Sequence, residues 1–164
     1  MSHLRLVDIC IVTRDLFRGI EPSKITYPVR VIDEVIPQIE RKLSKQPNHF
    51  SVQLSARSWG SEYLIGMMHR YEHHAKIVYS TSLNTCWRRF VICKELAHLL
   101  IDHEAHHFTT DPVSLVTGLV NNLDGLSINA DLRMNSEHIA ILGAMEIMHP
   151  WVLRHQLAKM APPV

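Results

Sequence analysis

The chain has 164 residues, enough for one domain that buries about two thirds of its unfolded surface, so we expect a single domain over residues 1–164. With 46% hydrophobic and 20% charged residues, its composition is that of a globular protein and excludes disordered and fibrous classes. The formal net charge is +1, from 17 lysines and arginines against 16 carboxylates. Without a uniform basic field, direct binding to nucleic acid is not expected, whereas 12 histidines make metal or proton chemistry worth testing.

The sequence predicts a cytoplasmic protein that does not cross a membrane. Charged residues interrupt the N-terminal segment, which therefore lacks the apolar region of a signal peptide. The longest apolar run, at 139–145, is far shorter than the roughly 20 residues that span a bilayer. If Cys86 and Cys93 share a helix they lie roughly 10 Å apart, beyond disulfide reach. Together with Cys10 they are expected to be free thiols in a reducing compartment.

The N-terminal part, residues 1–48, is predicted to be helical. Apolar residues recur at helical spacing over 4–18, although the stretch 9–12 is also compatible with a strand. A second helix is predicted over 28–44, with a kink at Pro37 because proline cannot donate the helical hydrogen bond.

From residue 50 the hydrophobic period changes to two. Strands are predicted at 50–54, 63–68 and 76–79, separated by turn-forming polar segments, and together they predict a small antiparallel sheet. We expect the segment 76–80 to form an edge of this sheet, where its free backbone groups can pair with an extended peptide.

A helix over 85–101, capped by Asn84 or Thr85, is apolar on nearly every side after Arg89. It is therefore predicted to be buried, with the sheet on one side, in a domain of the α+β class. Further helices are predicted at 113–121, at 137–148 with Ser136 as the cap, and at 151–160.

The buried helix contains Lys94-Glu95-Leu96-Ala97-His98, which has the form of the zinc-peptidase motif His-Glu-x-x-His with lysine in the first place. In that motif two histidines one helical turn apart bind Zn²⁺, and the glutamate activates the metal-bound water. A glutamate and a histidine at this spacing more often form a surface pair. On an apolar helix, however, an ionised carboxylate requires a partner.

The residues around this motif resemble those of the ImmA/IrrE family of zinc metallopeptidases. The segment 88–100 resembles the active-site helix of that family and agrees at Arg89, Phe90, Glu95, Leu96, His98 and the following leucines. A second family element matches at Glu137, Ala140, Ala144, Ile147, Met148 and Pro150, and the segment 75–84 resembles the strand that leads into the active helix. The resemblance covers about residues 50–150.

This resemblance implies a zincin-like fold, with a small sheet packed on the active-site helix and other helices around it. It implies zinc as the cofactor of an active enzyme, Glu95 as the catalytic residue, and His98 and Glu137 as metal ligands. The main departure is Lys94, which stands at the position of the first ligand and binds metal only when deprotonated. Gly143 replaces a bulkier apolar residue of the family pattern, which we expect to matter little.

Other residues are candidates to replace the missing ligand. His103-Glu104-Ala105-His106-His107 is a literal His-Glu-x-x-His, but it lies in a polar segment where a solvated helix end is the simpler interpretation. Asp102, one turn after His98, is a candidate oxygen ligand, although a carboxylate at a helix end more often faces water. Roles in solvent or in turns are favoured for His73, His74 and His138.

Two functions therefore remain open. The first is an active zinc endopeptidase that cleaves a regulatory protein such as a repressor. The second, which we favour, is a catalytically impaired or metal-free regulator that binds a peptide or protein partner, for example a transcriptional repressor or an antitoxin. In the second case Lys94 takes the place of the metal by ion-pairing with Glu137 and Glu95, so that Glu137 lies close to His98.

Overall fold

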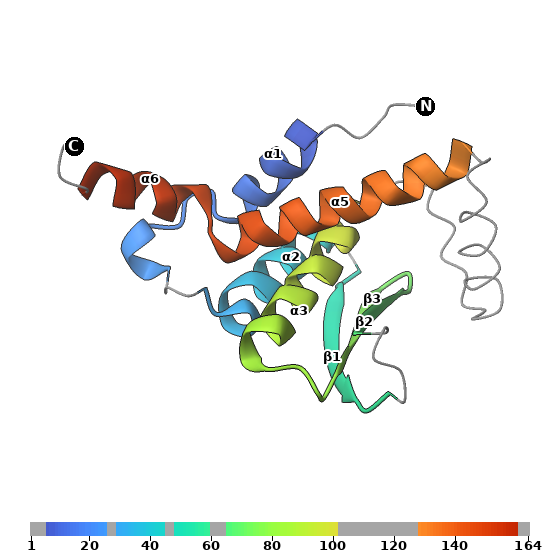
Figure 1. Cartoon of the computed structure of the whole chain (residues 1–164). Coiled ribbons are helices and arrows are strands. Elements are labelled where there is room, and N and C mark those ends of the chain that lie inside the picture. The colour runs from blue at the N-terminus through green and yellow to red at the C-terminus, as the bar shows by residue number, and fades with distance from the viewer. Residues whose placement is uncertain (1–5, 26–28, 45–47, 60–64, 102–127, 161–164) are drawn as a thin grey trace.

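The computed structural model describes residues 6–25, 29–44, 48–59, 65–101 and 128–160. Within these ranges, helices and one small sheet form an α+β structure, as the sequence predicts. No helix among these residues is both long and apolar enough to cross a bilayer. The elements are α1 (Leu6–Leu16), α2 (Ile36–Leu43), β1 (Ser51–Arg57), β2 (Gly66–Arg70), β3 (His74–Ser80), α3 (Thr85–Leu100), α5 (Ile128–Met148) and α6 (Trp151–Met160) (Figure 1).

The sheet has the strand order β1-β3-β2 and is mixed rather than antiparallel. Strand β3 lies in the middle, parallel to β1 and antiparallel to β2. Two predictions are therefore wrong: that the sheet is antiparallel throughout, and that segment 76–80 forms an edge. A period of two gives the faces of a strand but not its direction or its neighbours. The buried residues of β3 lie on both of its faces, Ala75 and Ile77 on one and Val78 on the other. Burial on both faces is typical of a central strand.

Helix α3 is the buried central helix that the sequence predicts. It packs against α5 on one side and against β2 and β3 on the other (Figure 1). Its N-terminus is capped by Asn84, whose Oδ1 accepts a 3.0 Å hydrogen bond from the backbone N–H of Trp87. The buried residues of α3 are Val91, Ile92, Cys93, Glu95, Leu96, Ala97 and Leu99.

Helix α5 begins at Ile128, so Ser136 lies inside the helix and the predicted cap is wrong. Serine is a good cap only where the chain enters a helix, and neither proline nor glycine interrupts residues 128–136. Gly143 also matters more than the sequence suggests. A Cβ there would lie 2.8 Å from Cβ of Ala97 on α3 and 2.9 Å from Cγ1 of Ile9 on α1. The missing side chain therefore lets α5 lie close to both helices.

The N-terminal part is helical, as predicted, but it is more divided than the sequence suggests. Helix α1 occupies most of the predicted range, and Thr13 inside it donates its hydroxyl to the carbonyl of Ile9 at 2.7 Å. A π-helical turn, Val31–Val35, precedes α2. Pro37 lies in the first turn of α2, where its missing N–H costs little. The single helix predicted over 28–44 is therefore divided, and its type changes at Ile36, next to Pro37.

The C-terminal helix α6 and the state of the cysteines agree with the sequence predictions. Helix α6 follows the buried Pro150 and covers 151–160. Cys10, Cys86 and Cys93 are free thiols. Burial raises the pKa of the Cys93 thiol to about 12, with the Arg89 charge acting against it, so this thiol is protonated and unreactive at neutral pH.

Candidate functional site

The candidate site lies between α3 and α5. Helix α3 carries Lys94, Glu95 and His98 within about one turn, and α5 brings Glu137 to them across 43 positions of sequence from Lys94. The geometry depends on the close packing of α3 and α5 that Gly143 permits. These four side chains are called the Lys94 cluster below.

Direct contacts join the members of the Lys94 cluster. Nε2 of His98 lies 3.0 Å from Oε1 of Glu137, so the predicted approach of these two residues is confirmed. Nζ of Lys94 donates to Oε2 of Glu137 at 2.9 Å and lies 3.4 Å from Oε1 of Glu95. The predicted pairing of the lysine with both carboxylates is therefore also present. One ammonium group bridges two acidic side chains.

The cluster is buried on the α3 side and open on the α5 side. The exposed fraction is 7% for the Glu95 side chain, 22% for Lys94 and 15% for His98, but 55% for Glu137. A partner that approaches from solvent therefore meets Glu137 first, whereas Glu95 is accessible only through its neighbours.

Gly66, at the start of β2, lets the sheet lie close to the cluster. A Cβ at this position would lie 2.2 Å from Cγ1 of Val91 and 3.5 Å from Oε1 of Glu95. Only glycine leaves room for α3 to lie this close to β2. The sequence analysis did not single out Gly66, because a glycine inside a strand indicates close backbone approach without indicating its partner.

Burial and charge shift the pKa values of three cluster members. Burial raises the pKa of the Glu95 carboxyl, and the charge of Lys94 only partly offsets this effect. Burial lowers the pKa of Lys94, but the charge of Glu95 and the hydrogen bond to Glu137 raise it more, so the net shift is upward. The hydrogen bond from His98, assisted by that from Lys94, lowers the pKa of Glu137 to about 2. At neutral pH the lysine is therefore a cation beside an ionised Glu137.

The described residues do not fit a zinc ion. No group of three or more histidine, cysteine or acidic side chains within the described ranges is arranged to hold a metal. The Lys94 ammonium donates to the carboxylates that would face the metal, and Nε2 of His98 is directed at Glu137 instead. With Lys94 protonated, only two of the three protein ligands of a catalytic zinc site have a counterpart here. The metal-binding and catalytic roles of Glu95, His98 and Glu137 stay predictions.

The other candidate ligands are not part of the described cluster. Asp102, His103, Glu104 and His107 lie outside the described residues, as does the helix predicted over 113–121. Of the remaining histidines, His138 is exposed on α5, and His73 and His74 lie at the turn between β2 and β3. His74 stacks on Tyr71 with ring centroids 4.3 Å apart, which is a structural contact.

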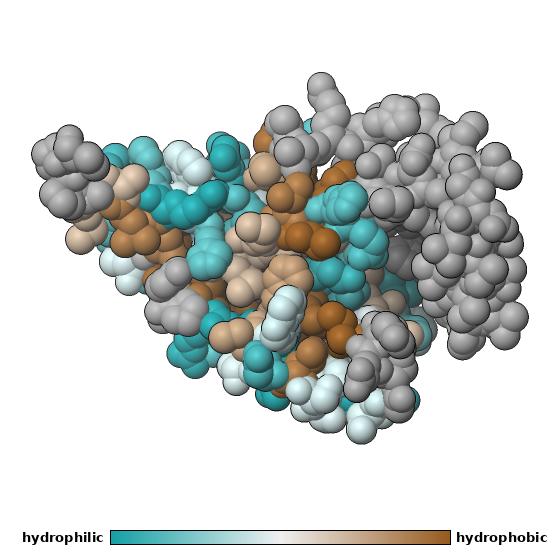
Figure 2. Space-filling model, in the orientation of Figure 1, coloured by the Kyte–Doolittle hydropathy of each residue, from teal (hydrophilic) through white to brown (hydrophobic). Residues whose placement is uncertain are grey.

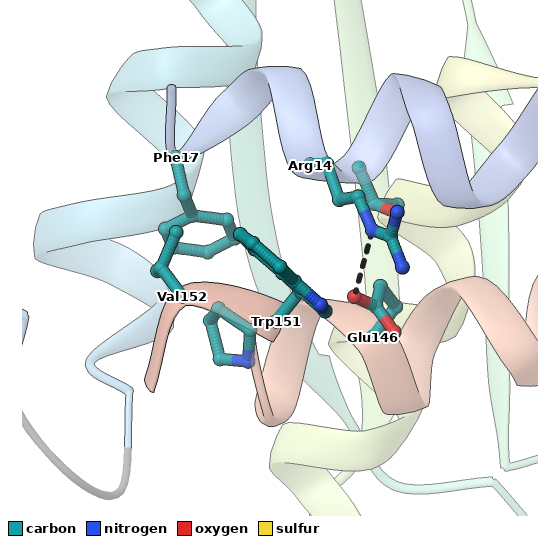
Figure 3. A pocket seen from close by; sticks show the side chains of 7 residues that line it. Arg14, Phe17, Glu146, Trp151 and Val152 are labelled. Atoms are coloured by element: carbon teal, nitrogen blue, oxygen red, sulfur yellow. Dashed lines mark ion pairs between the residues drawn. The ribbon is translucent and has the colours of Figure 1, made fainter. Parts of the chain in front are cut away.

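A second group of charged residues lies where α1, α5 and α6 meet, and sequence reasoning did not identify it. Glu146 on α5 pairs with Arg14 of α1 at 3.9 Å (Figure 3). It also pairs with Arg154 of α6. The Arg14 guanidinium lies 5.3 Å from the ring centroid of Trp151. The pocket beside it measures only about 10 Å³, room for about one water molecule. We call these residues the Glu146 cluster, and their contacts hold three helices together.

Comparison with models of known protein families and with curated proteins finds no match to this chain.

Proposed function

We propose that this protein resembles the zincin-like peptidases of the ImmA/IrrE family in fold but works without the metal, as a cytoplasmic regulator that binds a peptide or protein partner. The observation that carries the proposal is the position of Lys94, whose ammonium pairs with Glu137 at 2.9 Å and with Glu95 at 3.4 Å. A fixed positive charge there balances the two carboxylates, as a divalent cation does in an active enzyme. The cluster therefore holds together without a cofactor.

The surface beside Glu137 supports a binding role. Ile141 and Met145 follow Glu137 at intervals of four residues, so the three lie on the same side of α5. Met145 is 53% exposed, and apolar surface lies among polar residues on the face shown in Figure 2. The acidic Glu137, the partly buried Ile141 and the exposed Met145 together suit a partner segment that presents a basic residue and an apolar residue.

Metal content tests the loss of the cofactor. We expect purified native protein to contain no stoichiometric zinc, and the Lys94→His variant to bind one zinc per chain with a rise in Tm. Lys159→His, on exposed α6, is the matched control, since it adds the same residue away from the cluster and is expected to bind no zinc. Stoichiometric zinc in the native protein that is lost in His98→Ala and Glu137→Gln would support the active endopeptidase instead.

Site-specific cross-linking tests the binding role. A photoreactive amino acid at Met145 is expected to capture one partner in cells, whereas the same group at Ile32, which is 62% exposed in the π-helical turn, captures none. The captured protein, once purified, should bind the native chain and lose about tenfold in affinity against Met145→Lys. Equal capture at both positions, or no effect of Met145→Lys, would contradict the proposed surface.

A further inference from the structure

A hollow of about 160 Å³ lies on the sheet, on the side away from the Lys94 cluster. The missing Cβ of Gly66 points at Val91, so Gly66 faces α3, and its neighbour Met67 faces the opposite way. Cross-strand partners share a face, which puts Val78 with Met67 and Lys76 with His69 on the outer side. These four residues are among those that line the hollow. The hollow is therefore separate from the proposed partner site.

Basic and aromatic side chains gather around this hollow. Arg57 from β1 and the outward-facing Lys76 supply cationic groups, His69 supplies an imidazole, and Trp59 and Tyr71 supply aromatic rings. The described lining residues include no carboxylate. A small, local basic site is compatible with a net charge of +1 because that charge is a sum over the whole chain.

The basic groups lack compensation within the described part of the chain. The cross-strand neighbours of Lys76 are Gln53 on β1 and His69 on β2, so neither brings an acidic group to the lysine. In the described ranges no ion pair involves Arg57, His69 or Lys76, whereas several basic residues on the helices, such as Arg14, Lys42 and Lys94, have one. An anion in the hollow would satisfy these donors.

The aromatic residues beside the hollow favour a ligand that contains a planar group, which can stack on their rings. Tyr71 is held by its stacking on His74, 4.3 Å between centroids with an angle of 13° between the planes, yet remains 48% exposed. Met67 and Val78 form an apolar surface between the basic groups and the rings. Sites that combine cations with stacking rings are suited to nucleotides. The volume is below the roughly 300–1,000 Å³ of drug-sized pockets, which favours one base and one phosphate over a longer chain.

We propose that this outer face of the sheet binds a nucleoside monophosphate. The phosphate is bound by Arg57 and Lys76, and the base stacks against Trp59 or Tyr71. This site is independent of the Lys94 cluster and of the proposed loss of zinc.

Calorimetric titration of the full chain with uridine monophosphate tests the proposal. We expect saturable binding of one molecule per chain, and about tenfold weaker binding of uridine and of inorganic phosphate, because each lacks one of the two recognised groups. Lys76→Gln is expected to weaken binding about tenfold, and Lys159→Gln, the same change on exposed α6, to leave it unchanged. Trp59→Leu and Tyr71→Leu together should also weaken binding about tenfold. Circular dichroism checks that each variant is folded.

Three results would overturn the proposal. One is the absence of saturable binding. Another is equal affinity for inorganic phosphate and uridine monophosphate, which would show that the rings contribute nothing. The third is tighter binding of a single-stranded oligouridylate than of the monophosphate, which would make the face a nucleic-acid groove.

Discussion

Helix α5 carries two glutamates, and each pairs with two basic side chains. The two clusters differ in how deeply these basic partners are buried. Glu146 pairs with Arg14 and Arg154, whose side chains are about half exposed. Glu137 pairs with His98 and Lys94, which are mostly buried, and Lys94 also contacts a second, buried carboxylate. In the Glu146 cluster, a carboxylate that is only 11% exposed joins three helices, and its two arginines reach solvent. The Lys94 cluster instead contains Glu95, a buried carboxyl whose ionisation disfavours the folded state.

This contrast separates a contact that joins helices from a cluster that holds a buried acid. Arg14 and Arg154 bring half-exposed charges to the largely buried Glu146 carboxylate, so each arginine keeps contact with water and the loss of one leaves the other in place. In the Lys94 cluster, burial raises the pKa of Glu95, so its ionisation disfavours folding unless a cation is close. A protein has little reason to keep such a glutamate for stability alone. Its position next to His98 and Glu137 supports the likeness to a peptidase-like site that we propose.

The largest expected effect is the loss of the lysine. Lys94→Met leaves Glu95 and Glu137 without their shared cation, and we expect a loss of about 2–4 kcal/mol in the free energy of unfolding. Arg14→Met removes one half-exposed partner of Glu146 at 3.9 Å and leaves Arg154 in place, so it should cost less than about 1 kcal/mol. Urea denaturation of both variants and the native protein measures the difference. Equal losses would show that the two clusters are of the same kind.

The next effect concerns the spacing of the helices that carry both clusters. Gly143→Ala adds a Cβ 2.8 Å from that of Ala97, and neither backbone can move without shifting α5 relative to α3. We expect a loss of about 1–3 kcal/mol from overpacking, although alanine is the better helix former. Met145→Ala, at an exposed position two residues later, is the control and should change stability little. Unfolding in urea provides the measurement, and a gain in stability for Gly143→Ala would contradict the observed packing.

The sequence predicted the Lys94 cluster better than it predicted the surroundings. The motif spacing placed Glu95 and His98 on one helix, and the resemblance added Glu137 from a distant one. The packing roles of Gly66 and Gly143 were not predicted, because a glycine that permits close packing cannot be distinguished in sequence from one that does not. The Glu146 cluster was not predicted either. Its arginines lie on two different helices, and the hydrophobic period of a helix does not indicate how helices are arranged relative to one another.

The fold was predictable to the level of its elements but not of their connections. Helix α3 was identified with its cap because apolar residues surround it and Asn84 precedes it. The central position of β3 was missed, although the consecutive apolar residues Ile77 and Val78 indicate burial on both faces. Strand direction depends on how the chain returns between strands, which is a property of tertiary packing.

The smallest expected effect concerns how Glu137 and Glu95 of the Lys94 cluster change the stability of the fold with pH. The pKa of Glu137 is about 2 in the folded protein against an ordinary 4.5, so its stabilising contribution is present above pH 4.5 and is lost as the pH falls toward 2. The pKa of Glu95 is raised, so its contribution has the opposite sign: ionisation disfavours the folded state as the pH rises above 4.5.

Unfolding free energies between pH 2 and 7 test these signs in Glu137→Gln and Glu95→Gln. Glu137→Gln should reduce the loss of stability between pH 4.5 and 2, by less than about 1 kcal/mol because the side chain is 55% exposed. Glu95→Gln should leave that acid range nearly unchanged and increase stability relative to the native protein as the pH rises above 4.5. If both variants follow curves parallel to that of the native protein, the charges of the cluster are not coupled to folding, and Lys94 does not act in place of a metal.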